Sequence, residues 1–397
     1  MFSVLLAVIY LSYISLGLPD SLPGAAWPSM QQTLGVPMSC AGVLSAVISL
    51  STVFSGLMAD RLLRRFGTGP VAAGSVLLTA AAMSGYSAAG HFVTLCILAV
   101  PYGLGAGAVD AALNHYVAVH YPARHMSWLH CFWGIGAAAS PYIMSFHLRR
   151  GADWQGGYRT VAAIQLLLTV MLFCALPLWK PTAPETAAGA NASAEHIPLK
   201  KLLRRRGVRR VLLMFFCSSA FESTAGLWAS SFLVTSRGLR AETAAQFASC
   251  YYIGITAGRL AGGFFADRLG DLRMIRIGLC GAAAGTALLL APHSSALACC
   301  GLIVTGFGAA PVYPCLLHRT PAAFPGHQAQ QMIGLQIAAA YTGTTVMPAL
   351  AGRLAACGCM RYLPAVLTAF PVLLLCMTLR PAAEQQPSAD TDCSGEL

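Results

Sequence analysis

Charged residues are scarce in this sequence of 397 residues. Lys, Arg, Asp and Glu together make up 10% of it, against roughly 25% in an ordinary soluble domain. A globule of this length would lack the charge to cover its surface, so a soluble globular protein is excluded. Intrinsic disorder is excluded as well, because hydrophobic residues make up 56% of the chain and disordered segments are poor in them. The composition is typical of a polytopic membrane protein.

The motifs that carry most enzymatic chemistry are also missing. No glycine-rich phosphate loop with a lysine occurs, so ATP-driven pumping is unsupported. Four histidines from His115 to His130 recur every five residues, but neighbours on one helix face are three or four apart, which argues against a metal site. The 14 cysteines are scattered. With no nucleophile–base pair within the hydrophobic segments, we expect no enzyme, no metal and no cofactor.

Twelve segments are long and apolar enough to cross a bilayer, for which about 20 residues are needed. The first lacks a basic leader and a cleavage pattern, so it is not expected to be a removed signal peptide. Gly17, Pro19, Pro23, Gly24 and Pro28 are expected to interrupt its ladder of helical hydrogen bonds. The predicted spans are 2–30, 37–59, 69–89, 92–119, 126–147, 158–179, 209–235, 242–265, 274–292, 294–317, 327–352 and 360–379.

Lysine and arginine are unevenly shared between the loops of the two membrane faces. An even number of spans puts both termini on one face, whose loops carry 17 of the 25 basic residues, against 7 on the other face. The positive-inside rule therefore predicts cytoplasmic termini in a multi-pass protein of the plasma membrane, the inner membrane of a bacterial cell. The net charge of +11 reflects this topology and attraction to anionic lipid headgroups. Nucleic acid is not needed as a partner, and we expect a monomer.

The longest polar stretch divides the chain into two blocks of six spans. It begins with a proline-containing segment and ends in the basic run 200–206, which predicts a flexible linker followed by an amphipathic segment on the inner leaflet. The predicted organisation is an N-terminal six-helix bundle at 1–180, a cytoplasmic linker at 181–208, a C-terminal six-helix bundle at 209–380 and a disordered cytoplasmic tail at 381–397.

The two blocks resemble each other in sequence. A Gly-x-x-Ala-Asp-Arg motif follows the second span at 56–61 and the eighth span at 263–268, an offset of 207. The glycine-rich segment that begins at 103 corresponds to the one that begins at 306, with an offset of 203. Asp20 corresponds to Glu222 with an offset of 202. Three similar offsets in the same order indicate a duplication. Repeated six-span blocks are a transporter architecture, with the binding site between the repeats near the middle of the bilayer.

These motifs resemble those of a known transporter family. The first loop motif is similar to the loop 2–3 signature of the major facilitator superfamily, although Leu63 stands where the family has glycine, and the second copy keeps Gly270. The segments 16–28 and 110–114 resemble the branch of fucose-permease-like sugar–proton symporters. The superfamily resemblance implies an all-α fold of 12 transmembrane helices in two pseudo-symmetric six-helix bundles. It also implies that the signature residues close the cytoplasmic side through charge contacts: Gly56, Asp60, Arg61, Arg64, Arg65, Gly263, Asp267 and Arg268.

Apart from Glu242, the first residue of the eighth span, three carboxylates lie inside predicted spans, where a charge is costly and usually functional. They are Asp20, Asp110 and Glu222. A carboxyl group in a span can take up a proton on one side, lose its charge and release the proton on the other. The resemblance implies proton coupling and substrate binding at Asp20 and Asp110. Glu222 lies outside that pattern and is expected to be a second proton site, a substrate ligand or a partner of Arg259.

Further polar and aromatic residues are candidates for lining a sugar cavity. Asn114 follows Asp110 by four residues, so both project from one helix face and can hold hydroxyl groups. Aromatic rings pack on a sugar face while its rim accepts and donates hydrogen bonds. The other candidates are Trp27, His130, Trp133, Trp228, Tyr252, Tyr313, Gln336 and Tyr341.

The sequence thus predicts a secondary transporter that imports a small polar solute, such as a monosaccharide, together with a proton. Two alternatives stay open. One is a proton-driven exporter of drugs or metabolites, faintly suggested by glycines and Pro141 in the fifth span. The other is a membrane receptor that binds its ligand without transporting it.

Overall fold

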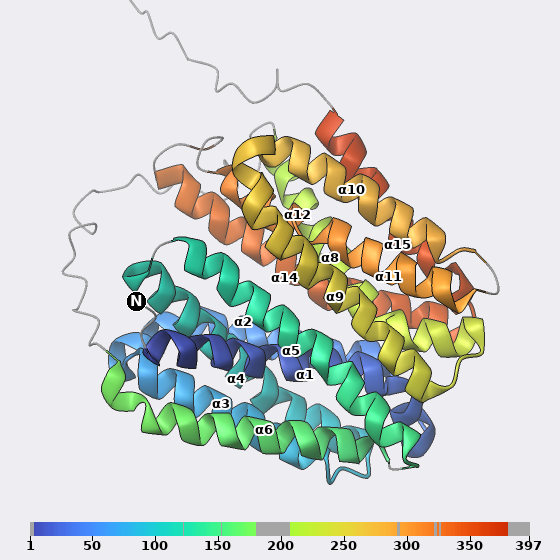
Figure 1. Ribbon diagram of the computed structural model, residues 1–397, viewed down its shortest axis with the longest axis horizontal. Coiled ribbons are helices and arrows are strands. Elements are labelled where there is room, and N and C mark those ends of the chain that lie inside the picture. The colour runs from blue at the N-terminus through green and yellow to red at the C-terminus, as the bar shows by residue number, and fades with distance from the viewer. Residues whose placement is uncertain are drawn as a thin grey trace, which may run out of the picture.

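Long helices account for nearly all of the computed structural model, which describes residues 4–121, 123–151, 153–179, 207–291, 294–320, 324 and 327–379 (Figure 1). No strand occurs in these ranges. The first half holds α1 (Val4–Leu34), α2 (Cys40–Phe66), α3 (Thr68–Tyr86), α4 (Phe92–His120), α5 (Ala123–Arg149), α6 (Trp154–Cys174) and the short η1 (Leu176–Leu178). The second half holds α8 (Val208–Arg237), α9 (Ala241–Leu269), α10 (Asp271–Leu288), α11 (Ser295–Ala309), α12 (Val312–His318), α14 (His327–Ala356), η2 (Met360–Tyr362) and α15 (Leu363–Leu379).

Each of the twelve predicted spans falls on this series of helices. The tenth is divided, because α11 ends at Ala309 and α12 begins at Val312, just after Pro311. The first span is one continuous helix through Pro19, Pro23 and Pro28, so the prolines, which have no N–H to donate, remove hydrogen bonds from the ladder without ending the helix. Packing stabilises α1 along its length, because it lies against α5 and α6 of its own half and against α8 and α9 of the other.

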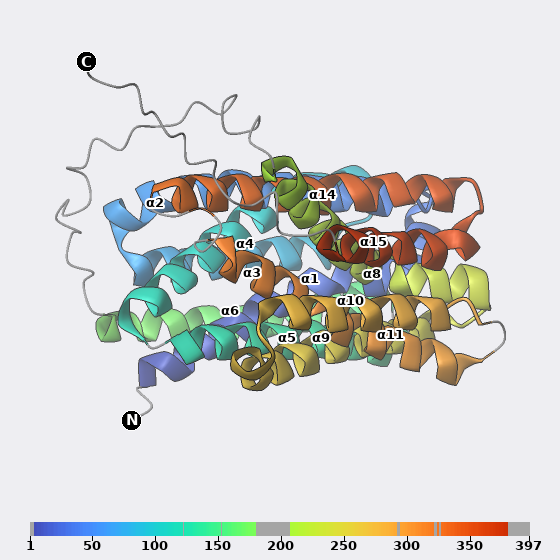
Figure 2. The same cartoon turned by 90° about the horizontal axis from the view of Figure 1, so that it is seen from above.

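The two halves meet along four helix pairs, α1 with α8, α1 with α9, α5 with α9, and α2 with α14. In Figure 1 the helices of the first half lie below those of the second, and Figure 2 shows the same molecule from above. The end that carries residues 35–39 and 238–240 lies away from the N-terminus and is called the far end. Three close contacts between the halves lie toward it: Gly24 on the backbone of 226–227, Gly42 on that of 348–349, and Ser249 Oγ donating to the Ala138 carbonyl at 2.8 Å. Another, between Gly134 of α5 and Thr256 of α9, lies near the middle of the two helices.

The duplication seen in the sequence recurs in the packing. A Cβ atom on Gly103 of α4 would collide with the Ile48 carbonyl of α2, and one on Gly306 of α11 would collide with the Tyr251 carbonyl of α9. The two glycines are 203 residues apart in the chain, and so are the two residues whose carbonyls they contact. Gly105 and Gly308 repeat the relationship against α3 and α10. Equivalent helices in the two halves therefore approach each other through equivalent glycines.

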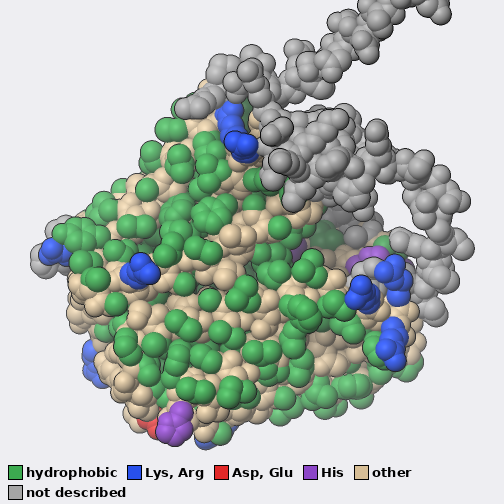
Figure 3. All heavy atoms as spheres, turned by 180° about the vertical axis from the view of Figure 1, so that it is seen from behind, with side chains coloured by type: hydrophobic (Ala, Val, Ile, Leu, Met, Phe, Trp, Pro, Cys, Tyr) green, Lys and Arg blue, Asp and Glu red, His purple; other side chains and the backbone are tan. Residues whose placement is uncertain are grey.

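The surface is that of a membrane protein. Seven segments of the described chain are long and apolar enough on their own to cross a bilayer, among them Val4–Leu34 and Met360–Leu379. The other predicted spans lie on helices that are less apolar. Figure 3 shows hydrophobic side chains over the middle of one face, with Lys and Arg toward its margins.

Some predictions fall on residues that the structure does not describe. The predicted linker lies outside the described residues except for 207 and 208, and so does the whole predicted tail at 381–397. The side chains of Asp60 and Asp267 are also outside them. The predicted domain boundaries stay predictions.

Candidate functional site

Asp20 occupies the middle of α1, and its side chain is exposed although the residues around it on the helix are buried. Its Oδ1 accepts a hydrogen bond from the Tyr102 hydroxyl at 2.7 Å, and its Oδ2 accepts one from the Trp133 indole at 2.8 Å. Because α1 is packed between helices of both halves, the exposed surface of Asp20 faces the space between the halves and not the lipid. A solvated carboxylate therefore lies at the centre of the fold.

Asp110 on α4 forms a second carboxylate site beside the first. Its Oδ1 accepts hydrogen bonds from the Tyr13 hydroxyl at 2.9 Å and from the Asn114 amide at 3.0 Å. Since Tyr102 is on α4 and Tyr13 is on α1, each helix supplies one tyrosine to the aspartate of the other. The two hydrogen bonds lie about two helical turns apart along α1 and α4. They fix the two helices against each other and orient each carboxylate.

Glu222 on α8 is paired with the arginine that the sequence suggested. The Arg259 Nη2 atom lies 3.1 Å from Glu222 Oε1, and the two side chains are 18% and 26% exposed. The Tyr251 hydroxyl donates to the Glu222 backbone carbonyl at 3.1 Å, which adds a second tie between α8 and α9. An ion pair that is only partly removed from water can be broken and remade by a solute or a proton.

Trp133 on α5 connects the carboxylates of the two halves. The guanidinium carbon of Arg259 lies 4.8 Å from the centroid of the Trp133 ring, a cation–π contact. The Tyr252 ring packs edge-on against the same indole, with centroids 6.4 Å apart. A continuous path of contacts therefore runs from Asp20 through Trp133 and Arg259 to Glu222, across the boundary between the halves.

Three more of the predicted candidates lie around this path. His130 packs edge-on against Tyr13, with centroids 5.7 Å apart, and lies within electrostatic reach of Arg259. Tyr341 on α14 lies within electrostatic reach of both Asp20 and Asp110. Tyr313 on α12 is within such reach of Asp110 and Glu222. The site is thus built from seven helices and contains acids, one cation, an amide and several phenol rings.

The remaining three candidates lie elsewhere. Trp27 is fully buried toward the far end, where its indole donates to the Met38 carbonyl at 2.8 Å. Trp228 is likewise buried and donates to the Pro348 carbonyl at 2.9 Å. Gln336 is fully buried on α14, and its Oε1 accepts from the Thr320 hydroxyl at 2.9 Å. The structure does not bring these three side chains together with the carboxylates.

Tyr13 and Tyr102, which donate hydrogen bonds to the two aspartates, were not among the residues predicted from the sequence. A signal was present, because Tyr13 precedes Asp20 by seven residues and Tyr102 precedes Asp110 by eight, which puts each pair on one helix face. The pattern is weak, since tyrosine is also common at membrane interfaces.

The residues of the two signature loops lie far from this site, at helix ends. A Cβ atom on Gly56 or on Gly263 would meet nothing within 4 Å. The Arg61 Nη1 atom lies 4.0 Å from the Met58 sulfur on the same helix. The loop motifs therefore have free space around their glycines in this conformation.

Comparisons with known proteins agree with the architecture. The model of the Major Facilitator Superfamily matches residues 9–249 and 211–392. An uncharacterized MFS-type transporter of Yersinia pestis is 24% identical over 269 residues, which cover 66% of this chain and 66% of that protein. The chain spans 56% and 66% of the length of the two curated relatives that it matches.

Two solved structures have a similar fold. A mutant of the nucleoside transporter NupG superposes with a TM-score of 0.77 at 12% identity, covering 94% of this chain and 98% of the other. A D-xylose-proton symporter superposes with a TM-score of 0.74 at 15% identity, covering 95% and 97%. At these identities the likeness concerns the fold alone.

Proposed function

The chain belongs to the major facilitator superfamily, and we propose that it imports a small polar solute rich in hydroxyl groups, such as a monosaccharide, together with a proton. The family consists of transporters and not of enzymes, and the protein is a multi-pass membrane protein. The solute, the coupling ion and the direction of transport are the proposed part.

The observation that carries the proposal is the exposed Asp20 in the middle of α1, joined through Trp133 to Arg259. A carboxyl group is the side chain that most simply carries a proton across a protein interior, because protonation removes its charge. Asp20 has solvent access for proton exchange and a contact path to the opposite half. Its charge can therefore influence how the halves sit against each other.

The proposed cycle uses this link. When Asp20 is charged, the indole N–H of Trp133 is held by it, and Trp133 in turn lies under Arg259. Protonation weakens the hydrogen bond to Trp133, since hydrogen bonds to a charged acceptor are the stronger ones. The link between the halves loosens, and the loaded carrier can reorient without moving a buried negative charge.

The close contacts at the far end favour a state from which the site would open toward the other end. The halves are in close contact toward the far end, at Gly24, Gly42 and Ser249. With both termini in the cytoplasm, as the basic loops predict, the far end is the outer one. The solute and the proton would then leave from this state.

The groups around the acids suit a solute with several hydroxyls. Asn114 and the two aspartates offer acceptors and donors side by side, while the rings of Trp133 and Tyr252 offer flat apolar surfaces. NupG, which has a similar fold, is a nucleoside transporter, and a nucleoside presents the same combination of a polyol and a flat ring. Nucleosides therefore belong in the panel of solutes beside hexoses and pentoses.

Uptake into proteoliposomes tests the proposal. An inward proton gradient should drive accumulation of one member of the panel, and Asp20→Asn should abolish accumulation while keeping exchange of solute across the membrane. Asp110→Asn should lower both. Unchanged accumulation in both variants would overturn proton coupling through these residues.

The same vesicles distinguish the alternatives. Solute that moves against an inward proton gradient would identify an exporter. Saturable binding with no exchange of labelled for unlabelled solute would identify a receptor.

A further inference from the structure

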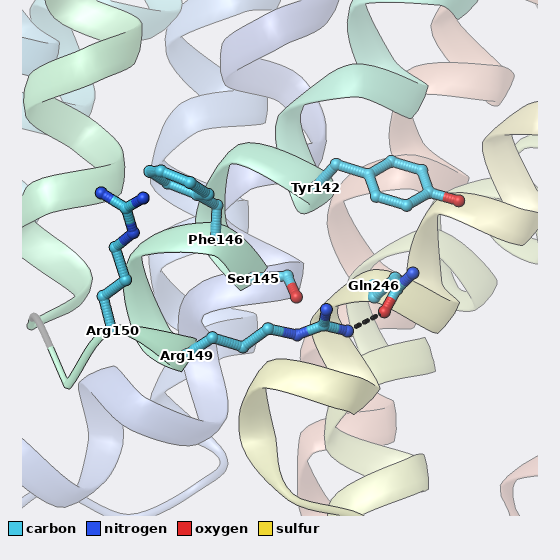
Figure 4. A pocket seen from close by; sticks show the side chains of 6 residues that line it. All are labelled: Tyr142, Ser145, Phe146, Arg149, Arg150 and Gln246. Carbon is cyan, nitrogen blue, oxygen red and sulfur yellow. Dashed lines mark hydrogen bonds between the residues drawn. The ribbon is translucent and has the colours of Figure 1, made fainter.

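A separate pocket of about 430 Å³ lies between α5 and α9, toward the far end and away from the carboxylates (Figure 4). Arg149 and Arg150 are adjacent in the chain, and Figure 4 shows their side chains on opposite sides of the pocket. Arg149 donates a hydrogen bond to the Gln246 side chain of α9, and the guanidinium carbon of Arg150 lies 4.2 Å from the centroid of the Phe146 ring. The residues that line the pocket are Tyr142, Ser145, Phe146, Arg149, Arg150 and Gln246.

The pocket carries uncompensated positive charge. None of its lining residues is acidic. Glu242 lies one helical turn before Gln246, but its Oε1 is 2.5 Å from the Arg240 side chain and is thus already paired. Two guanidiniums beside a serine hydroxyl and an amide make a site for an anion with several acceptor oxygens, which is the chemistry of a phosphate ester.

The outer wall of the pocket faces the lipid. Ile135, Tyr142 and Phe146 lie on one face of α5 and are exposed by 46%, 43% and 50%. Figure 4 shows Phe146 beside Arg150, and Tyr142 on the side of Gln246. Aromatic side chains at the membrane interface mark the level of the lipid headgroups. An acyl chain can therefore leave the pocket along this face while the polar end stays beside the arginines.

We propose that this pocket binds the phosphate of an anionic phospholipid from the leaflet at the far end, between Arg149 and Arg150. A zwitterionic headgroup brings its own cation beside the phosphate and is the weaker ligand. The Arg149–Gln246 hydrogen bond joins α5 of one half to α9 of the other. A lipid phosphate held there stabilises the closed far end, so the composition of that leaflet would set how readily the transporter opens.

The test measures the thermal stability of the delipidated, detergent-purified protein while short-chain phosphatidylglycerol is added, because a ligand that binds the folded state raises the melting temperature with its concentration. We expect a saturable rise with phosphatidylglycerol and a much smaller one with phosphatidylcholine. In Arg149→Gln/Arg150→Gln the apparent Kd should increase at least about tenfold, since two charge-assisted hydrogen bonds are lost.

Arg361→Gln is the matched control. Arg361 also lies over an aromatic ring, 4.8 Å from the centroid of Tyr362, but has no second arginine in a pocket beside it. It should keep the response to phosphatidylglycerol. Arg149→Lys/Arg150→Lys should recover part of the affinity, which shows that the variants fold and that charge is what was lost.

Two results would overturn the proposal. A response to phosphatidylglycerol that is the same in the double glutamine variant would place the lipid elsewhere. Equal stabilisation by glycerol 3-phosphate at the same concentration would show that a soluble phosphate ester, and not a lipid, is the ligand.

Discussion

The guanidinium carbon of Arg259 lies 4.8 Å from the centroid of the Trp133 ring, which puts a cation from one half of the chain over an aromatic ring from the other. The indole N–H of that ring donates to Asp20 at 2.8 Å. The cation is held on its other side by Glu222 at 3.1 Å. One indole therefore separates two opposite charges and contacts both, and any change of charge at Asp20 acts directly on the contact between the halves.

Replacing Trp133 with phenylalanine tests this link. Trp133→Phe keeps a ring beneath Arg259 but removes the hydrogen bond to Asp20. We expect proton-driven uptake to fall about tenfold, the loss typical of one charge-assisted hydrogen bond, while exchange in the absence of a gradient falls less. Proteoliposome uptake and counterflow measure the two rates.

Trp154→Phe is the control for this change. It also removes an indole N–H, but one that has no hydrogen-bond partner among the described residues. Its uptake should stay near that of the native protein. Equal losses of uptake in the two variants would show that the smaller ring, and not the lost hydrogen bond to Asp20, causes the effect.

The Glu222–Arg259 pair should behave as a unit in stability measurements. Glu222→Gln and Arg259→Gln each leave one partly buried charge without its partner, and each is expected to cost about 2 kcal/mol of stability. The double variant should cost clearly less than the sum, because no unpaired charge remains. Thermal melting in detergent gives the values, and strictly additive losses would argue against a functional pair.

The fold was largely predictable from the sequence because a bilayer imposes a length and a hydropathy that local patterns reveal. The family resemblance singled out Asp20 in the first span and Asp110 in the fourth, but not that α1 and α4 lie against each other. Long-range details were not predictable: α1 continues as one helix through three prolines, with α5 and α8 packed against it. The break between α11 and α12 at Pro311 was also missed.

The candidate site divides in the same way. Charges within spans are rare enough to stand out, so Asp20, Asp110 and Glu222 could be found one by one, and the suggested pairing of Glu222 with Arg259 is confirmed. The tyrosines that orient the aspartates could not, because their role arises only when α1 and α4 are placed side by side. Trp27 and Trp228 were candidates for lining a sugar cavity only because they have aromatic rings. In the structure both are packed near the far end.

Gly306 and Gly263 both belong to motifs that are repeated in the two halves, but replacement by alanine should affect them differently. Gly306 lies against the Tyr251 carbonyl, so a methyl group forces α11 away from α9, whereas Gly263 has open space around it. We expect Gly306→Ala to lower the melting temperature and the yield of folded protein sharply. Gly263→Ala should leave both unchanged in this conformation. Size-exclusion profiles and melting curves of the two variants provide the comparison.

The closed far end offers a direct test of alternating access. A Cβ atom on Gly352 of α14 would lie 3.3 Å from the Ser39 Cα and 3.1 Å from its carbonyl oxygen, at the start of α2. These positions are close enough for a disulfide between the halves. In a variant whose native cysteines are replaced, Ser39→Cys/Gly352→Cys should cross-link on oxidation.

If the halves must separate here during transport, the cross-link should abolish uptake, and reduction should restore it. Each single cysteine variant, oxidised in the same way, controls for damage by the oxidant. Full uptake by the cross-linked protein would mean that the far end stays shut throughout the cycle. The alternating-access mechanism proposed for this chain would then be wrong, whatever solute it carries.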